Sequence, residues 1–271
     1  MWQIFMSVDV YLPEDQRERR RRRFYFVIVI VVAIVYFVVI AAGWLFLRTP
    51  IFSVKSVEIV GNQDIEEGEI LSVILSRVIR GSYWRALLGI NNILIWPERL
   101  SEEDLIFLPK AQSVELEKDY EGRSVIVKVV EREPYGIWCL TSPLECWWFD
   151  DEGVIFKRGI FAQGSLIVTV SDYSQQMFGL RSKILPEEFI PSALSVFDVL
   201  RKSGLGIKEI RLNDLKLEEL EVLTFDGPRI LFSLRFSAKN TLEVIKQLSA
   251  KSGFKDLEYV DFRVENRVYY K

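Results

Sequence analysis

The chain has 271 residues, of which 49% are hydrophobic and 27% are charged, so it is neither intrinsically disordered nor built mainly from membrane-spanning segments. Its formal net charge of −3 offers no cationic surplus to neutralise phosphates, and we therefore expect no nucleic-acid partner. The sequence contains no histidine, which is the commonest general base and metal ligand, and many enzyme classes are disfavoured by that absence.

Residues 24–47 form a segment without a charged side chain. As a helix it would reach about 36 Å, which exceeds the roughly 30 Å of a bilayer's hydrocarbon core. Aromatic residues stand at both edges, at 24–26 and at Trp44, where a membrane interface favours them. The segment is too long and uncharged for a typical core helix, and no small-residue cleavage site follows it. The sequence predicts a single transmembrane helix over 24–47.

Basic residues lie almost entirely on one side of this segment. Arg17 and the arginines at 19–23 precede it, whereas only Arg48 and then Lys55 follow closely. The positive-inside rule therefore predicts a cytoplasmic basic tail, 1–23, and an extracytoplasmic body, 48–271.

Residues 48–131 read as strand, helix, short helix, strand, strand. Alternation of apolar and polar residues predicts strands at 54–60, 114–120 and 124–130, with a Glu121-Gly122 turn joining the last two. Helical spacing predicts a helix whose buried stripe contains Ile70, Val73, Ile74 and Val78, with Asp64 as its N-cap. Ser101 and the acids that follow it predict a short helical turn.

Residues 132–271 predict a second domain in which strands outnumber helices. We expect strands at 147–149, 154–156, 164–170, 207–213, 218–225, 229–236, 257–263 and 266–270, and helices at 186–204 and 239–252. The acids at 150–152 are what a hairpin turn needs, and a metal site there is the weaker interpretation because no further ligand set is evident.

The two cysteines, Cys139 and Cys146, flank a turn-like loop outside the predicted membrane helix. A disulfide across the neck of a hairpin and two half-buried thiols are both consistent with this spacing. A bridge closing so small a loop would stabilise by about 2–3 kcal/mol at best.

No catalytic constellation is recognisable: the chain lacks a nucleophile elbow, a Walker A loop, a dinucleotide-binding glycine motif and a His/Cys metal set. We therefore expect no enzyme activity, no cofactor and no small-molecule substrate. An enzyme alternative remains, a membrane-anchored cell-wall enzyme using carboxylates such as Glu131 and Glu133.

Several short motifs follow the predicted membrane helix in a fixed order. They are Phe52-x-Val54-x-x-Val57-x-Ile59-x-Gly61-Asn62, Gly89-Ile90-Asn91-Asn92-Ile93, Leu108-Pro109, Val129-Val130-Glu131-Arg132-Glu133-Pro134 with Trp138, Trp148-Phe149-Asp150-x-x-Gly153-x-x-Phe156, and Tyr259-Val260-Asp261-Phe262-Arg263 with Arg267-Val268. In this combination the chain resembles the FtsQ/DivIB cell-division family. It departs from the family pattern at Lys110-Ala111-Gln112, and the two cysteines are not part of that pattern.

The resemblance implies an α+β protein with one transmembrane helix, a POTRA domain (β-α-α-β-β) at 48–131 and a mixed, curved β-sheet domain with packed helices at 132–271. It implies a non-enzymatic scaffold of septum assembly in the inner membrane at the division septum. The implied partners are FtsB (also called DivIC), FtsL, other division membrane proteins and the lipid bilayer. A POTRA-bearing chaperone of secretion or outer-membrane assembly is the alternative among binding proteins.

The binding surface that the resemblance implies is the end of the chain. A terminal strand is a sheet edge to which a partner strand can add, and Arg263 would pair with a partner carboxylate. We expect the contact residues to be Arg263, Val264, Glu265, Asn266, Arg267, Val268, Tyr269 and Tyr270.

Overall fold

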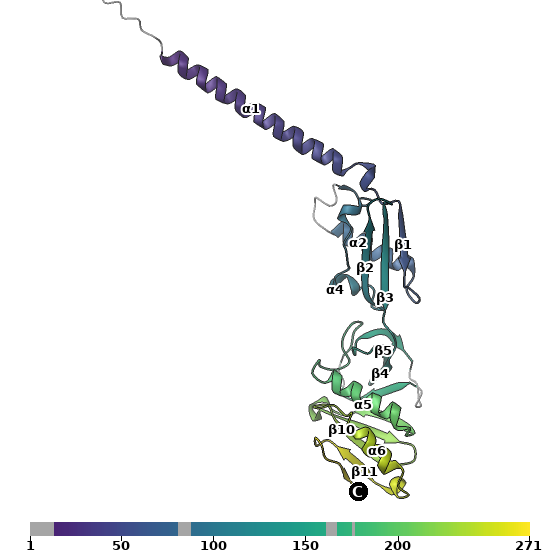
Figure 1. The fold of residues 1–271 in the computed structure, drawn as a ribbon. Helices are drawn as coiled ribbons and strands as arrows, with labels where there is room; N and C mark the ends of the chain where they lie inside the picture. The colour runs from purple at the N-terminus through teal and green to yellow at the C-terminus, as the bar shows by residue number, and fades with distance from the viewer. Residues whose placement is uncertain (1–13, 81–87, 161–166, 175–176) are drawn as a thin grey trace, which may run out of the picture.

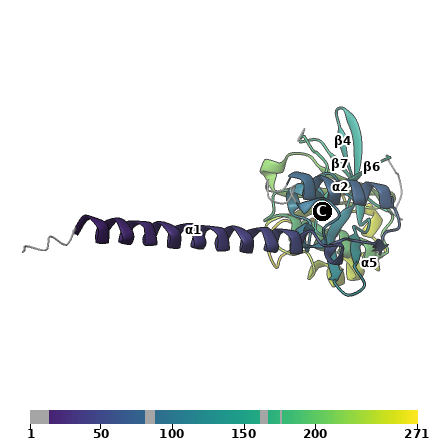
Figure 2. The ribbon, with the colours of Figure 1, turned by 90° about the horizontal axis from the view of Figure 1, so that it is seen from above.

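The computed structural model describes residues 14–80, 88–160, 167–174 and 177–271 of the chain. It is a mixed α+β structure in which one long helix precedes a three-stranded sheet and a nine-stranded sheet. The helix projects from one end of the body and the C-terminus lies at the other end (Figure 1). Seen from above, the helix does not fold back on either sheet (Figure 2).

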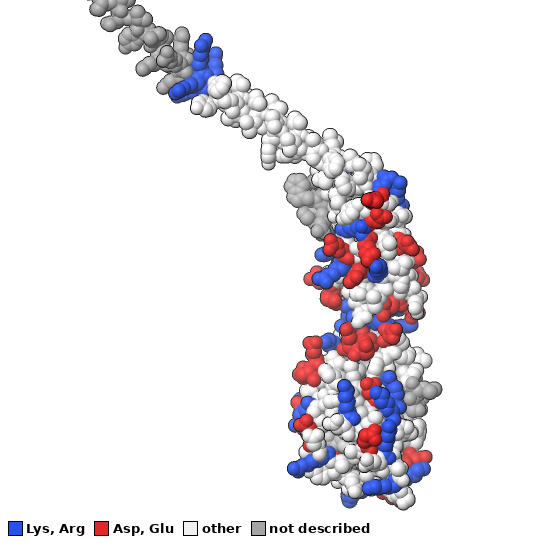
Figure 3. Space-filling model, viewed as in Figure 1, with Lys and Arg blue, Asp and Glu red and all other residues white. Residues whose placement is uncertain are grey.

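The long helix α1 spans Glu14–Leu47. It begins before the predicted start at residue 24, so that the arginines of the basic tail continue the same helix. Within residues 20–47 an 18-residue window has a mean hydropathy of 3.2 and is not buried against the body, and in the described ranges this is the one helix apolar and long enough to cross a membrane. Figure 3 shows it without charge along its length and basic at its N-terminal end.

The first globular part, which we call the three-stranded unit, extends from η1 (Pro50–Phe52) to the end of β3. Its elements are β1 (Ser56–Val60), α2 (Glu67–Arg80), η2 (Ile93–Ile95), α4 (Glu102–Leu105), β2 (Ala111–Asp119) and β3 (Ser124–Glu131). β3 lies in the middle of the sheet, parallel to β1 and antiparallel to β2. The predicted order of elements is therefore confirmed. The stretch 81–87 lies outside the described residues.

Burial of one face explains why α2 packs on this sheet. All four residues of its predicted stripe are buried in a core shared with β2 and β3. The predicted N-cap, Asp64, is wrong, because the helix begins at Glu67. Instead the Glu131 carboxylate accepts hydrogen bonds from the backbone N–H groups of residues 63–65, at 2.7–3.0 Å. A residue distant in sequence thus orders this loop.

The second globular part, the nine-stranded unit, has a core of its own. Its strands are β4 (Gly136–Thr141), β5 (Leu144–Phe149), β6 (Ile155–Gly159), β7 (Val168–Asp172), β8 (Ile207–Leu212), β9 (Glu219–Thr224), β10 (Arg229–Ser233), β11 (Tyr259–Phe262) and β12 (Tyr269–Tyr270). Its helical segments are α5 (Ile190–Ser203), η3 (Leu215–Leu217), α6 (Thr241–Ser249) and η4 (Phe254–Asp256). The strand order is β12-β11-β10-β9-β8-β7-β4-β5-β6. Of the strand predicted at 164–170, residues 164–166 lie outside the described residues.

The two longer helices of this unit connect parallel neighbours. β7 and β8 run parallel and are joined through α5, while β10 and β11 run parallel and are joined through α6. Parallel strands need such a crossover, and both helices bury one apolar face in the unit's core. Gly204 ends α5 in the left-handed conformation with φ of 74°, as its position in the sequence predicts.

Candidate protein-binding edge and the junction between the sheets

The residues predicted to bind a partner lie at one extremity of the nine-stranded sheet. β12 is the outermost strand there, pairs antiparallel with β11, and contains only Tyr269 and Tyr270. The predicted strand over 266–270 is thus too long. Asn266 has a φ of 57°, and the N–H of Arg267 donates to the carbonyl of Val264 at 3.1 Å, so the chain turns here. Residues 263–268 form a turn before a short edge.

Hydrogen-bond alternation shows which main-chain groups of this edge point outward. Tyr259 and Lys271 exchange N–H to carbonyl bonds of 3.4 and 3.3 Å. In an antiparallel pair the bonded positions alternate, so Tyr269 also faces β11 and Tyr270 turns its N–H and carbonyl away from the sheet. Both tyrosine side chains are about half exposed. The edge therefore offers a main-chain donor and acceptor together with two exposed rings.

Arg263 is not free to receive a partner carboxylate. Its guanidinium donates to both carboxylate oxygens of Asp261, at 3.0 and 2.7 Å, and to Glu219 at 2.8 Å. These hydrogen bonds to two carboxylates raise the pKa of Arg263. We therefore interpret Arg263 as a residue that fixes the turn after β11 to the middle of the sheet.

No family model matches the chain, and no curated protein matches it.

The pair formed by Asp261 and Arg263 predicts a pH dependence of stability. Burial raises the pKa of Asp261, but the Arg263 guanidinium and its backbone N–H outweigh that effect and hold it below its usual 3.8. A carboxyl with a lowered pKa stabilises the fold above its unfolded pKa and loses that contribution as pH falls through the folded value. Asp261→Asn should cost about 1 kcal/mol at pH 7, since solvent screens the partly exposed pair. The difference from wild type should shrink below about pH 4. Urea unfolding of the full chain at pH 7 and pH 3 measures it, and a difference that grows on acidification would contradict it.

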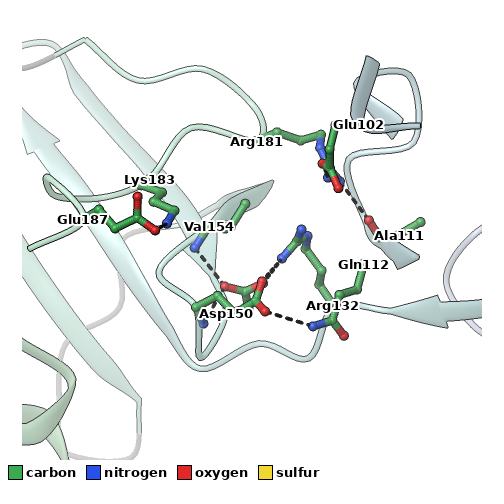
Figure 4. A network of polar contacts seen from close by, with 10 residues as sticks. Glu102, Ala111, Gln112, Arg132, Asp150, Val154, Arg181, Lys183 and Glu187 are labelled. Atoms are coloured by element: carbon green, nitrogen blue, oxygen red, sulfur yellow. Dashed lines mark hydrogen bonds and ion pairs between the residues drawn. The ribbon is translucent and has the colours of Figure 1, made fainter. Parts of the chain in front are cut away.

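The junction between the two units contains a buried ion pair, shown in Figure 4. Arg132 follows β3, and its guanidinium contacts Asp150 in the turn between β5 and β6; the side chains are 5% and 2% exposed. The other oxygen of Asp150 accepts the N–H groups of Glu152 and Val154, at 3.0 and 2.8 Å. Asp150 thus stabilises the predicted turn and also pairs with Arg132, the residue that follows the three-stranded unit.

Further polar contacts surround this pair. Arg181 donates to the backbone carbonyl of Ala111 at 2.9 Å and to Glu102 at 2.5 Å (Figure 4), while Lys157 reaches Asp64 at 3.3 Å. These links connect residues of the nine-stranded unit to three segments of the three-stranded unit. None of them is predictable from the sequence pattern, because each joins residues more than 60 positions apart.

Cys139, Cys146 and Tyr135 each form a bond within the fold that leaves them unsuited to catalysis. Cys139 and Cys146 are directly opposite on β4 and β5 and form a disulfide, which leaves neither of the chain's two cysteines free. Burial, together with the Asp198 carboxylate that accepts its hydroxyl at 2.8 Å, raises the pKa of Tyr135 well above its usual value. That phenol remains protonated at physiological pH and is unsuited to act as a base.

Of the two carboxylates named for the enzyme alternative, Glu131 already has hydrogen-bond partners within the fold. Glu131 accepts three backbone N–H groups, which is a structural use of its oxygens. Over the described residues no group of three or more metal-ligating side chains comes together.

Proposed function

We propose that this protein is a membrane-anchored, non-enzymatic scaffold of bacterial cell division, similar to the FtsQ/DivIB family. In this proposal residues 1–23 are a cytoplasmic tail and 24–47 cross the inner membrane. Residues 48–131 are a POTRA domain, and 132–271 are an extracytoplasmic β domain that binds FtsB (DivIC) and FtsL at the septum.

The observation that carries the proposal is the arrangement of two features at opposite ends of the molecule. An apolar helix that buries nothing occupies one end, and a short sheet edge with outward main-chain groups occupies the other. A protein built this way can present a strand-accepting edge away from a membrane surface. The β-α-α-β-β order of the three-stranded unit supports the POTRA assignment.

The division partners follow from the resemblance in sequence, and the edge supplies a physical means of binding them. A partner segment in extended conformation could pair with the outward N–H and carbonyl of Tyr270 and lie against the two exposed tyrosine rings. Main-chain pairing would then contribute more of the affinity than Arg263, whose charge is already paired within the sheet.

The proposal can be tested by measuring the membrane topology and the cellular location of a chain that has a tag at each end. A reporter that is active only outside the cytoplasm, fused after Lys271, should be active, because the arginines of the tail hold the N-terminus inside. A fluorescent protein at the N-terminus should gather at division septa. A stably expressed chain with an inactive reporter, or with fluorescence spread evenly around the cell, would contradict the proposal.

A further inference from the structure

A groove of about 720 Å³ lies between the two units, at the sheet edge opposite β12. One wall is a face of α2 together with the segment that leads into β2, and the other wall comes from β5, β6 and the chain before α5. In Figure 1 these elements meet midway along the body, away from α1. The lining residues used below are Glu69, Arg80, Phe107, Lys110, Trp147, Lys157, Arg158 and Leu180.

The mouth of the groove exposes apolar side chains that the two cores do not require. Phe107 is 60% exposed and Leu180 is 46% exposed, while the floor beneath them is formed by buried residues of both units, including Leu108 and Phe156. Exposed apolar side chains at the mouth of a concave surface are typical of a binding site.

The charge of the groove is opposite in sign to that of the whole chain. Four of its lining residues are cationic and only Glu69 is acidic, although the chain has a net charge of −3. The two lysines already contact Asp64. The two arginines lie instead over aromatic rings of the groove, Arg80 at 5.3 Å from Phe107 and Arg158 at 5.1 Å from Trp147. The Nε of Arg80 donates to the backbone carbonyl of Ser76 at 3.3 Å, and the terminal nitrogens of a stacked guanidinium group remain available for carboxylates.

The same groove contains a buried donor without an acceptor. Trp147 is only 6% exposed, and its indole N–H has no hydrogen-bond partner within the described part of the chain. An unpaired buried donor is costly, so most buried indoles find an acceptor. A carbonyl or carboxylate oxygen brought into the groove beside Arg158 would supply one after a movement of the side chains that cover the N–H.

We propose that this groove binds an acidic peptide segment of a protein partner, in which carboxylate side chains alternate with apolar ones. The carboxylates would contact Arg80 and Arg158, the apolar side chains would lie against Phe107 and Leu180, and a peptide oxygen would accept from Trp147. Charge complementarity selects this occupant. The position of the groove away from α1 disfavours a lipid headgroup. The site is separate from the β12 edge and does not depend on the function proposed for that edge.

Fluorescence anisotropy of the full chain in mild detergent tests the inference. The probe is a fluorescein-labelled peptide in which aspartate alternates with leucine and phenylalanine. Arg80→Glu and Arg158→Glu, at exposed positions, should each weaken binding about tenfold or more, because each replaces an attractive charge with a repulsive one. Trp147→Phe, which keeps an aromatic ring but removes the N–H, should weaken it about two- to tenfold. Lys239→Glu, an exposed charge reversal elsewhere, should leave the affinity unchanged.

Three results would overturn the inference. The first is equal affinity of wild type and both arginine variants for the probe. The second is equal binding of a peptide in which glycine replaces every apolar residue, since that would reveal charge attraction without the groove. The third is vesicles containing phosphatidylglycerol that bind wild type and lose binding in the same two variants, which would assign the groove to lipid.

Discussion

Asp150→Ala should destabilise the full chain by about 3–5 kcal/mol, the cost of leaving a buried charge without its partner. Arg132 is almost fully buried, and its Nε has no hydrogen-bond partner among the described residues, so it depends on the Asp150 carboxylate for compensation. Alanine also removes the acceptor of the turn's N–H groups. Urea unfolding followed by tryptophan fluorescence measures the loss.

Three companion variants separate the causes. Asp150→Asn keeps an acceptor for the turn but removes the charge, and it should fall between wild type and alanine. Glu152 also contacts the Arg132 guanidinium, at 3.2 Å, but its side chain is 54% exposed, so Glu152→Ala should cost no more than about 0.5 kcal/mol. Replacing Arg132 with methionine and Asp150 with asparagine removes both charges, keeps an acceptor for the turn, and should recover most of the stability lost in Asp150→Ala. A double variant as unstable as Asp150→Ala would contradict this account of the junction.

The second large effect is expected on partner binding. Under the proposed function, Tyr270→Pro should weaken binding of FtsB- and FtsL-like proteins by about tenfold to a hundredfold, because proline removes the outward N–H of the edge and its ring obstructs an added strand. Calorimetry with the purified full chain measures it. Tyr270→Ala keeps the main-chain donor and should cost less. Wild-type affinity in a folded Tyr270→Pro chain would place the binding surface elsewhere.

Proline at this position tests the surface without breaking the existing sheet. The N–H of Tyr270 points away from β11, whereas Tyr269 faces it. Tyr269→Pro should therefore disturb the pairing of β11 with β12. It is the control that shows how much binding is lost when this pairing itself is broken. Val268, one of the expected contact residues, lies outside the strand, in the turn, so proline there would not remove an N–H of β12.

The sequence pattern predicts local structure well where burial alternates regularly. β2, β3 and the buried stripe of α2 follow from their periodicity, because one face of each enters the core of the three-stranded unit. Element ends are less predictable. The helix expected from residue 186 begins at Ile190, since the N–H of Phe189 donates to the carbonyl of Pro186 and closes a turn first.

Pairings across long sequence separations are not encoded in a local pattern. The alignment of β7 with β8 and of β10 with β11, which helps to set the order of the nine strands, depends on helical crossovers that leave no signal in the strands themselves. The side-chain contacts of the candidate sites are likewise not encoded in a local pattern. Arg263 is predicted as a free contact residue, but Glu219, 44 positions away, is brought beside it by the sheet. Arg132 and Asp150 each fit a local motif, and only the fold shows them as a buried pair.

The central claim is that the chain is a division scaffold that holds partner membrane proteins. The most direct measurement identifies, by quantitative mass spectrometry, the proteins that co-purify with the tagged full chain after mild detergent extraction of the cells. We predict that FtsB- and FtsL-like division proteins are enriched with wild type and lost with Tyr270→Pro. Enrichment of secretion or outer-membrane assembly components instead, or recovery of the chain without any division protein, would contradict the account.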